Sequence, residues 1–385
     1  MTRLQRTPYL VLHKEQTPLK EVYGSSDGTV VVECMRIVPE GLPSKMAIVF
    51  SHPIGGGAFL PLVNALARAG HHVIYANTRY RGNDTALIME KCVADLGACL
   101  RDARKRFGYE QLVLGGWSGG GSLSLFYQDQ AEAPHLTHTP AGDPYDLTQM
   151  DLLPADGVML LAAHVSRAAT LTEWMDPSIT DESKPFERQR DLNIYDPDNP
   201  NKPPYDDAYV ERYRSAQRDR NHRITSWVRD QLRALTLSGT PQAERAFCVH
   251  GTMADLRWTD PTQDPSDRRP YTCYLGEPVL ANDGPVGLSR FTTLRSWMSQ
   301  WSLEASAAHG EKNAERISCP VLVLNNTADL ACTPSHARRL FNAVGHDRKE
   351  LHHVQGADHY YIERADLLPE AVDICSDWLR RQGFC

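Results

Sequence analysis

The chain has 385 residues, of which 48 are acidic and 41 basic, so its formal net charge is −7. One hydrophobic core rarely grows beyond about 250–300 residues, and we therefore expect a separate lobe beside the main domain. The acidic balance argues against the basic surface typical of nucleic-acid-binding proteins. The longest apolar run, Gly157 to Val165, has about half the length that a membrane span requires.

The nine cysteines are scattered without a C-x-x-C spacing. An odd number in this pattern argues against both a disulfide framework and a zinc site, so we expect reduced thiols. No signal peptide is evident at the N-terminus. Together these features predict a cytoplasmic protein. Adjacent histidines, at 71–72 and 352–353, are no metal site, because neighbours on a strand point to opposite faces.

The predicted elements begin with a β-hairpin over 22–38, with Ser26-Asp27-Gly28 as its turn. Strands follow at 46–51, 72–76 and 111–114, and helices at 58–69, 87–107 and 119–127. Short strands rich in β-branched residues that alternate with helices are typical of βαβ units. The sequence therefore predicts an α/β fold with a mostly parallel central sheet flanked by helices.

This alternation pauses after Val165 and resumes at Cys319. Strands are then predicted at 321–324 and 350–354, and helices at 334–344 and 366–382. The stretch between, 166–315, has repeated Asp-Pro pairs, a turn-rich run and helical patterns. We interpret it as an inserted, mainly helical lid, which divides the α/β domain into a first part, 1–165, and a second part, 316–385.

The strongest local signal for chemistry lies in QLVLGGWSGGGSLSLFY, residues 111–127. Within it, Gly116 to Gly120 fits the pattern G-x-S-x-G around Ser118, between a predicted buried strand and a helix, which is the context of a nucleophile elbow. Such a sharp turn pushes the serine hydroxyl out above the sheet edge, and glycines prevent collisions there. A phosphate-binding turn would carry a lysine after the glycines, and this turn has none.

These motifs resemble those of the α/β-hydrolase superfamily, and the resemblance covers about residues 25–165 and 316–385. It implies a serine esterase or lipase-like enzyme with a large helical cap, in which nucleophile, acid and base follow in that order. Ser118 would be the nucleophile, and Asp329 and His359, each after a predicted strand, would be the acid and the base. His359 would take the hydroxyl proton, and Asp329 would orient the imidazole and stabilise its cation. Asp358 is a rival acid, which we disfavour because adjacent loop side chains rarely point at each other.

The resemblance also implies an oxyanion hole in the loop 51–57, SHPIGGG, where the family has a His-Gly-x loop. Pro53 stands where glycine is common, and proline has no N–H. We therefore expect the N–H of Ile54, with that of Gly55 as the alternative, to act beside the N–H of Gly119. His52 is interpreted as a residue that braces the loop.

Most aromatic residues of the inserted lobe are expected to pack a core. Trp174 and Trp297, with Trp117 at the elbow, are predicted to line the substrate pocket. The preferred function is hydrolysis of a carboxylic ester of a medium-sized, partly apolar small molecule through an acyl-enzyme intermediate. No metal, cofactor, nucleic acid or membrane span is expected, and a homo-oligomer stays open.

Other activities stay open on the same triad, because one scaffold supports many chemistries. They are an amidase, a C–C bond hydrolase and an acyltransferase, the last because a similar helical insertion occurs in homoserine acetyltransferase-like enzymes. A non-catalytic ligand-binding protein is the least favoured alternative, since Ser118, Asp329 and His359 are all present.

Overall fold

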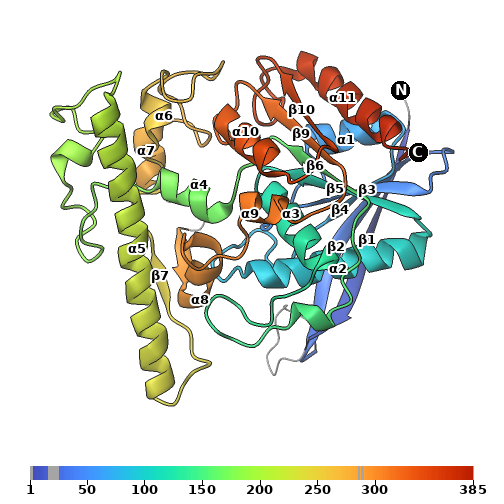
Figure 1. Cartoon of the computed structure of the whole chain (residues 1–385), viewed down its shortest axis with the longest axis horizontal. Helices are drawn as coiled ribbons and strands as arrows, with labels where there is room; N and C mark the ends of the chain where they lie inside the picture. The colour runs from blue at the N-terminus through green and yellow to red at the C-terminus, as the bar shows by residue number, and fades with distance from the viewer. Residues whose placement is uncertain (1–2, 16–25, 285–286, 288–289, 385) are drawn as a thin grey trace.

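The computed structural model describes residues 3–15, 26–284, 287 and 290–384. An eight-stranded sheet forms its centre (Figure 1). In spatial order the sheet contains β1 (Leu4–Lys14), β2 (Thr29–Pro39), β4 (Val73–Ala76), β3 (Met46–Ser51), β5 (Gln111–Trp117), β6 (Gly157–Leu161), β9 (Val321–Asn326) and β10 (Lys349–Val354). β2 is antiparallel to β1 and to β4, whereas all strands from β4 to β10 pair in parallel.

Helices cover both faces of this sheet (Figure 1). One face packs on α1 (Pro61–Arg68) and α11 (Leu368–Arg381), and the other on α2 (Met89–Phe107), α3 (Gly119–Glu132) and α10 (Pro334–Ala343). The pleat of β3 explains how one strand serves both layers: Val49 joins the α2–α3 side, while Ile48 and Phe50 join the α1–α11 side. Burial on both faces is why the inner strands are continuous apolar runs.

Residues 166–315, which we call the inserted segment, form most of the layer beside the sheet, on the left in Figure 1. They contain α4 (Arg167–Trp174), α5 (Asp207–Leu237), α6 (Leu256–Thr259), α7 (Pro278–Asp283), α8 (Leu294–Ser296), α9 (Gly310–Ala314) and the antiparallel pair β7 (Ala246–Cys248) and β8 (Phe291–Thr293). A π-helical turn spans Trp297–Trp301, and short 3-10 turns lie at Leu147–Gln149, Arg190–Leu192 and Ala365–Leu367. The segment has its own apolar cluster, which includes Ala331 and Cys332 from the loop after β9. Its limits as a separate unit stay a prediction.

The predicted fold class is confirmed, and the predicted strands and helices of the α/β units correspond to β3 to β5, β9, β10 and their helices. The second arm of the predicted hairpin corresponds to β2, and its first arm, 22–25, lies outside the described residues. Among the described residues, β2 pairs with β1, with Leu4 opposite Pro39 and Lys14 opposite Thr29. β1 is an edge strand with Val11 as its one buried residue, so its apolar pattern is weak.

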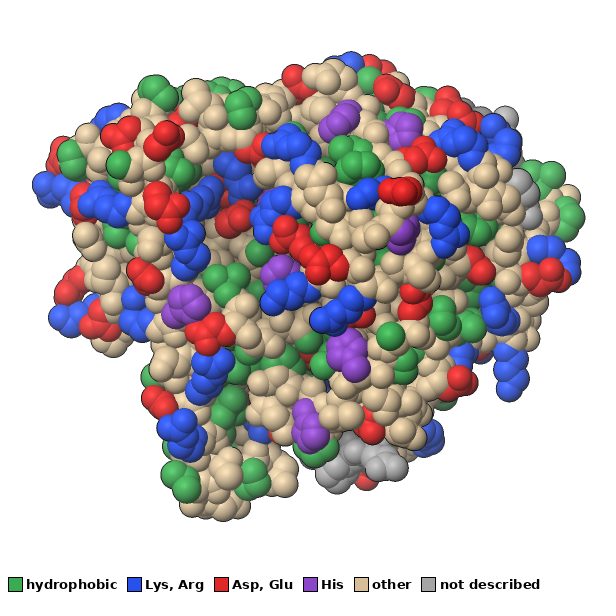
Figure 2. Space-filling model, viewed as in Figure 1, with side chains coloured by type: hydrophobic (Ala, Val, Ile, Leu, Met, Phe, Trp, Pro, Cys, Tyr) green, Lys and Arg blue, Asp and Glu red, His purple; other side chains and the backbone are tan. Residues whose placement is uncertain are grey.

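The face shown in Figure 2 has Lys and Arg interspersed with Asp and Glu over most of its area. Among the described residues, no helix combines the length and the apolar character that crossing a bilayer requires.

Candidate active site

The turn between β5 and α3 holds Ser118 in a backbone conformation that L-residues rarely adopt, with φ 54° and ψ −124°. The Ser118 N–H donates to the carbonyl of Leu161 in β6 at 3.2 Å, and its carbonyl accepts from the Gly121 N–H at 3.0 Å. The turn is thus fixed on both sides. Strain of this kind clusters at functional sites, where the surrounding structure holds it in place.

Close backbone packing explains the glycines around Ser118. A Cβ atom on Gly120 would lie 2.1 Å from the carbonyl oxygen of Ser51, and one on Gly116 would lie 2.7 Å from the Cα of Gly121. Neither backbone neighbour can rotate away as a flexible side chain would. Glycine is therefore required at these two positions because there is no room for a Cβ atom.

Asp329 and His359 form a tightly held pair. The Asp329 carboxylate is fully buried, and its Oδ2 lies 2.6 Å from Nδ1 of His359. Its Oδ1 accepts the N–H groups of Ala331 at 2.7 Å and Cys332 at 2.8 Å. An ionised carboxylate only accepts, so Nδ1 carries the ring proton, and Nε2 is left as the basic atom.

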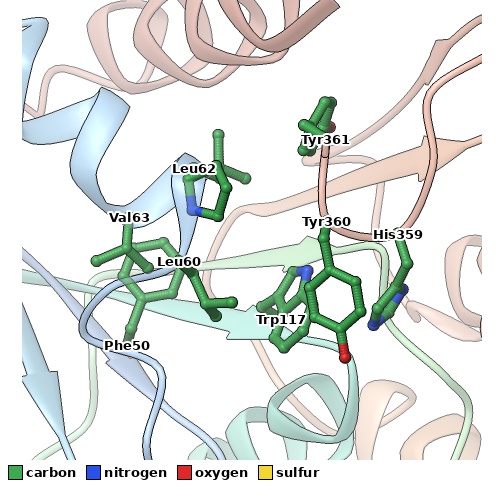
Figure 3. A pocket seen from close by; sticks show the side chains of 9 residues that line it. Phe50, Leu60, Leu62, Val63, Trp117, His359, Tyr360 and Tyr361 are labelled. Atoms are coloured by element: carbon green, nitrogen blue, oxygen red, sulfur yellow. The ribbon is translucent and has the colours of Figure 1, made fainter. Parts of the chain in front are cut away.

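The imidazole of His359 packs against neighbouring rings (Figure 3). Its centroid lies 4.5 Å from that of Trp117, which directly precedes Ser118, and 4.8 Å from that of Tyr360. Trp117 and Tyr360 are themselves 5.0 Å apart. These contacts restrict rotation of the base and place it beside the elbow.

No hydrogen bond joins Ser118 to His359 among the described contacts, and the thiol of Cys332 lies close to the Ser118 side chain. Burial raises the pKa of that thiol well above its usual value, and Asp329 raises it further, although Ser118 opposes the shift. The thiol is therefore neutral. Rotation about the Cα–Cβ bond of Ser118 is the motion that would exchange Cys332 for His359, since catalytic hydrogen bonds often tighten only once substrate is bound.

The rival acid Asp358 is engaged elsewhere. Its carboxylate accepts backbone N–H groups at 2.9 Å from Tyr360, 3.2 Å from Ile362 and 2.9 Å from Glu363. Burial opposes its ionisation, but these donors outweigh burial and lower its pKa. Asp358 thus organises the loop that carries His359.

Within the described part of the chain, two groups of side chains have the proximity that a metal ion would need. One is Asp329, Cys332 and His359, whose possible ligand atoms lie within 4.8 Å of one another, and it coincides with the pair described above. The other is His13, Glu15 and Asp95. The guanidinium of Arg79 already binds Glu15 at 2.8 Å and Asp95 at 2.7 Å, so a cation occupies the second group.

The loop 51–57 differs from the expectation. The N–H of Ile54 donates to Nδ1 of His52 at 3.3 Å, and that of Gly55 donates to the His52 carbonyl at 2.8 Å. Both N–H groups proposed from the sequence as oxyanion donors are thus engaged within the loop, because the chain turns back on itself at Pro53. The N–H of Gly119 starts α3, where the helix itself provides no acceptor.

A cavity of about 540 Å³ opens in front of Ser118. The predicted residues Trp117, Ser118, Ile54 and Trp174 border it, and the loop glycines form part of its wall. Its lining is His52, Ile54, Gly55, Gly56, Gly57, Phe59, Leu60, Pro61, Tyr75, Trp117, Ser118, His164, Arg167, Thr170, Leu171, Trp174, Tyr274, Ala331, Tyr360 and Ile362.

The prediction that Trp297 lines this cavity is wrong. Trp297 is fully buried, stacks on Trp301 with centroids 5.1 Å apart, and donates its indole N–H to Thr225 at 3.0 Å. The helical spacing of Trp297 arises because this residue packs in the apolar core of the inserted segment.

Sequence reasoning missed His164 and Arg167, which also border the cavity. His164 follows β6 as Ser118 follows β5, and parallel strands present their carboxyl ends at one sheet edge, which is the signal that identifies it. Burial lowers its pKa well below the usual value, and the charges of His336 and Arg167 add to this effect. Arg167 donates to Asp84 and to Gln300, each at 2.9 Å, so its charge is already paired.

Comparison with known proteins finds similarity in the fold. A sequence model of the alpha/beta hydrolase fold matches residues 37–136. Among solved structures, DcsB in complex with its substrate analogue is similar, with a TM-score of 0.53 and 10% identity over 98% of this chain and 100% of that one. The siderophore hydrolase EstB from Aspergillus fumigatus gives 0.49 with 12% identity, over 91% of this chain and 95% of its own. Est1E from Butyrivibrio proteoclasticus gives 0.46 with 12% identity, over 92% and 97%. No curated protein matches the sequence.

Proposed function

We propose that the chain is a serine hydrolase of the α/β-hydrolase superfamily, and that it cleaves a carboxylic ester through an acyl-enzyme intermediate. One observation carries the proposal: the buried Asp329–His359 pair, 2.6 Å long, lies beside the strained elbow of Ser118 at the wall of a cavity. A base held in one tautomer next to a serine is the arrangement that activates a hydroxyl.

In the proposed reaction, Oγ of Ser118 attacks the ester carbonyl carbon while its proton passes to Nε2 of His359. The carbonyl electron pair moves to oxygen, giving a tetrahedral oxyanion. When this intermediate collapses, the bond to the alcohol oxygen breaks, and the imidazolium returns its proton to that oxygen. Water then repeats the sequence on the acyl-enzyme and releases the acid. Asp329 stays ionised and stabilises the imidazolium.

The cavity supports an uncharged, medium-sized and partly apolar substrate. Its volume of about 540 Å³ lies within the usual range of small-molecule sites. Leu171, Trp174 and Tyr274 give it an apolar wall from the inserted segment. Of the described lining residues, only Arg167 carries a full charge, and Asp84 already pairs it at 2.9 Å.

Labelling with a fluorophosphonate probe tests this proposal. We expect one probe per chain on Ser118, located by peptide mass spectrometry, and no labelling or esterase turnover in Ser118→Ala. Ser122→Ala is the matched control, because this buried serine in α3 only donates to the carbonyl of Gly119 at 3.2 Å. Folded protein that stays unlabelled, or labelling that survives Ser118→Ala, contradicts the proposal.

A panel of p-nitrophenyl esters, lactones and amides then identifies the bond that is cleaved. Partition of the acyl group between water and an added alcohol distinguishes hydrolysis from acyl transfer. The cytoplasmic location stays a prediction.

A further inference from the structure

The loop 51–57 leaves few backbone donors for an oxyanion. Pro53 has no N–H, and the N–H groups of Ile54 and Gly55 bind within the loop. The N–H of Gly56 donates to Oδ1 of Asn77 at 2.7 Å. Stabilisation of the tetrahedral intermediate usually relies on preorganised donors aimed at the oxygen, and here the N–H of Gly119 needs a second partner.

His52 has the geometry of such a donor. A backbone N–H can only donate, so Nδ1 of His52, 3.3 Å from the Ile54 nitrogen, must be the acceptor. The neutral ring therefore carries its proton on Nε2. That atom faces the elbow, because a Cβ on Gly119 would lie 2.7 Å from it. His52 also borders the cavity together with Ser118.

The protonation state of His52 agrees with this geometry. Burial lowers the pKa of His52 to about 3, and electrostatic interaction with Arg167 contributes to the shift. The ring thus stays neutral from mildly acidic to alkaline pH. It cannot supply a proton to a leaving group over this range, but a neutral N–H can donate a hydrogen bond.

We propose that the Nε2–H of His52 is the second donor of the oxyanion hole, opposite the N–H of Gly119. The inference rests on the proposed function, since it concerns the oxyanion formed when Ser118 attacks. The carbonyl oxygen accepts both hydrogen bonds as it gains the electron pair, and His52 keeps its proton throughout. Nε2 of His164 is also close to Gly119, but Nδ1 of that ring has no partner among the described residues to fix its tautomer.

Two variants separate donation from loop bracing. In His52→Asn the side-chain oxygen takes the position of Nδ1 and can still accept from Ile54, but no donor reaches the position of Nε2. In His52→Gln the amide nitrogen reaches that distal position. We expect His52→Asn to lose about 10²–10³-fold in kcat with little change in KM, because one oxyanion donor is removed. The kcat of His52→Gln should stay within about tenfold of the wild-type kcat. On a free-energy scale, this is about half or less of the loss expected for His52→Asn.

The inhibition constant of a transition-state analogue distinguishes the two roles, because it would not change if His52 only braced the loop. An alkyl trifluoromethyl ketone forms a hemiketal oxyanion with Ser118, so its inhibition constant should rise in His52→Asn by the factor lost from kcat, while KM stays constant. Equal losses in both folded variants, or full activity in His52→Asn, would overturn the proposal. Thermal melting establishes that each variant is folded.

If His52→Asn does not fold, wild-type protein with ¹⁵N-labelled histidine decides the question. The Nε2–H proton resonance of His52, identified by its absence from His52→Gln, should move downfield when the trifluoromethyl ketone binds. An unchanged resonance would refute the donor role. A wild-type protein that neither turns over esters nor reacts with fluorophosphonate would instead refute the proposed function, so the two failures are distinguishable.

Discussion

At the residue scale, Asp329 has two structural tasks in one carboxylate. Oδ1 closes the loop after β9 through the N–H groups of Ala331 and Cys332, and Oδ2 meets Nδ1 of His359. The loop contacts need only an acceptor, whereas the contact with His359 depends on which ring nitrogen carries the proton. A substitution that retains an oxygen and adds a donor separates the two tasks.

Asp329→Asn makes that separation. Its amide oxygen can keep the loop contacts, but its NH₂ group would face Nδ1 and favour the tautomer in which Nε2 is protonated and no longer basic. We expect kcat for an ester substrate to fall about 10⁴-fold, with the melting temperature little changed. Asp358→Asn is the comparison, because its carboxylate binds backbone N–H groups and not His359. An Asp329→Asn variant with near-normal turnover, or a larger loss in Asp358→Asn, would assign the acid elsewhere.

At the element scale, the strand-to-helix turn depends on how closely α3 approaches β3. The Cα of Gly120 lies so near the Ser51 carbonyl that an added Cβ would be 2.1 Å from its oxygen. A methyl group there would have to displace α3 from the sheet. Since Ser118 is the residue that precedes α3, the same displacement would move the proposed nucleophile.

Gly120→Ala should lower the free energy of unfolding by about 3 kcal/mol, as overpacking of a rigid site does. Gly97→Ala in α2 is the control, because its Cβ would meet Cδ2 of Leu152, the end of a flexible side chain, at 2.7 Å. There, rotation of the Leu152 side chain relieves the clash. The remaining cost is offset because alanine is more favourable than glycine in a helix by roughly 1 kcal/mol. Urea denaturation of both variants measures the difference, and equal stability would show that α3 has room to shift.

At the scale of the whole molecule, an ionic network within the inserted segment is hydrogen-bonded to the loop that follows β9. Arg257 in α6 binds Asp255 at 3.0 Å and Glu173 at 2.5 Å. It also donates to Thr333 at 3.0 Å, in the loop between Asp329 and α10. Trp258 next to it donates its indole N–H to the carbonyl of Leu330 at 2.9 Å. The inserted segment thus supports the loop that carries Asp329.

Arg257→Met should lower the free energy of unfolding by about 3 kcal/mol, because it removes a buried cation from the fully buried Asp255 and from Glu173, although Asp255 keeps Arg214 at 2.7 Å. The exposed pair Arg218–Glu211 on α5 provides the control, and Arg218→Met should cost less than about 1 kcal/mol. Chemical denaturation followed by tryptophan fluorescence measures both values. Similar changes in the two variants would show that the network adds no more than a surface ion pair.

The sequence predicts most of the parallel strands because they are short apolar runs. It predicts the order of Ser118, Asp329 and His359 because each of them lies shortly after the end of such a strand. The sequence does not predict which hydrogen bonds form inside a loop. The engagement of the Ile54 N–H by His52 depends on ring orientation, which residue spacing does not encode. The sequence placed Trp297 at the cavity, whereas the structure has His164 there. Helical spacing identifies an apolar face but not whether that face packs in a core or meets a ligand.

The pairing of β6 with β9 has a consequence for the order in which the molecule is built. These neighbours in the sheet are separated in the chain by residues 162–320, so their pairing closes a very long loop, at an entropic cost of roughly 4–5 kcal/mol by the logarithmic scaling of loop closure. During synthesis the elbow of Ser118 emerges well before Asp329 and His359, which follow β9 and β10. The nascent chain therefore carries the proposed nucleophile without its proposed base until the inserted segment has been made and the last two strands have docked, so we expect reactivity only in the finished protein.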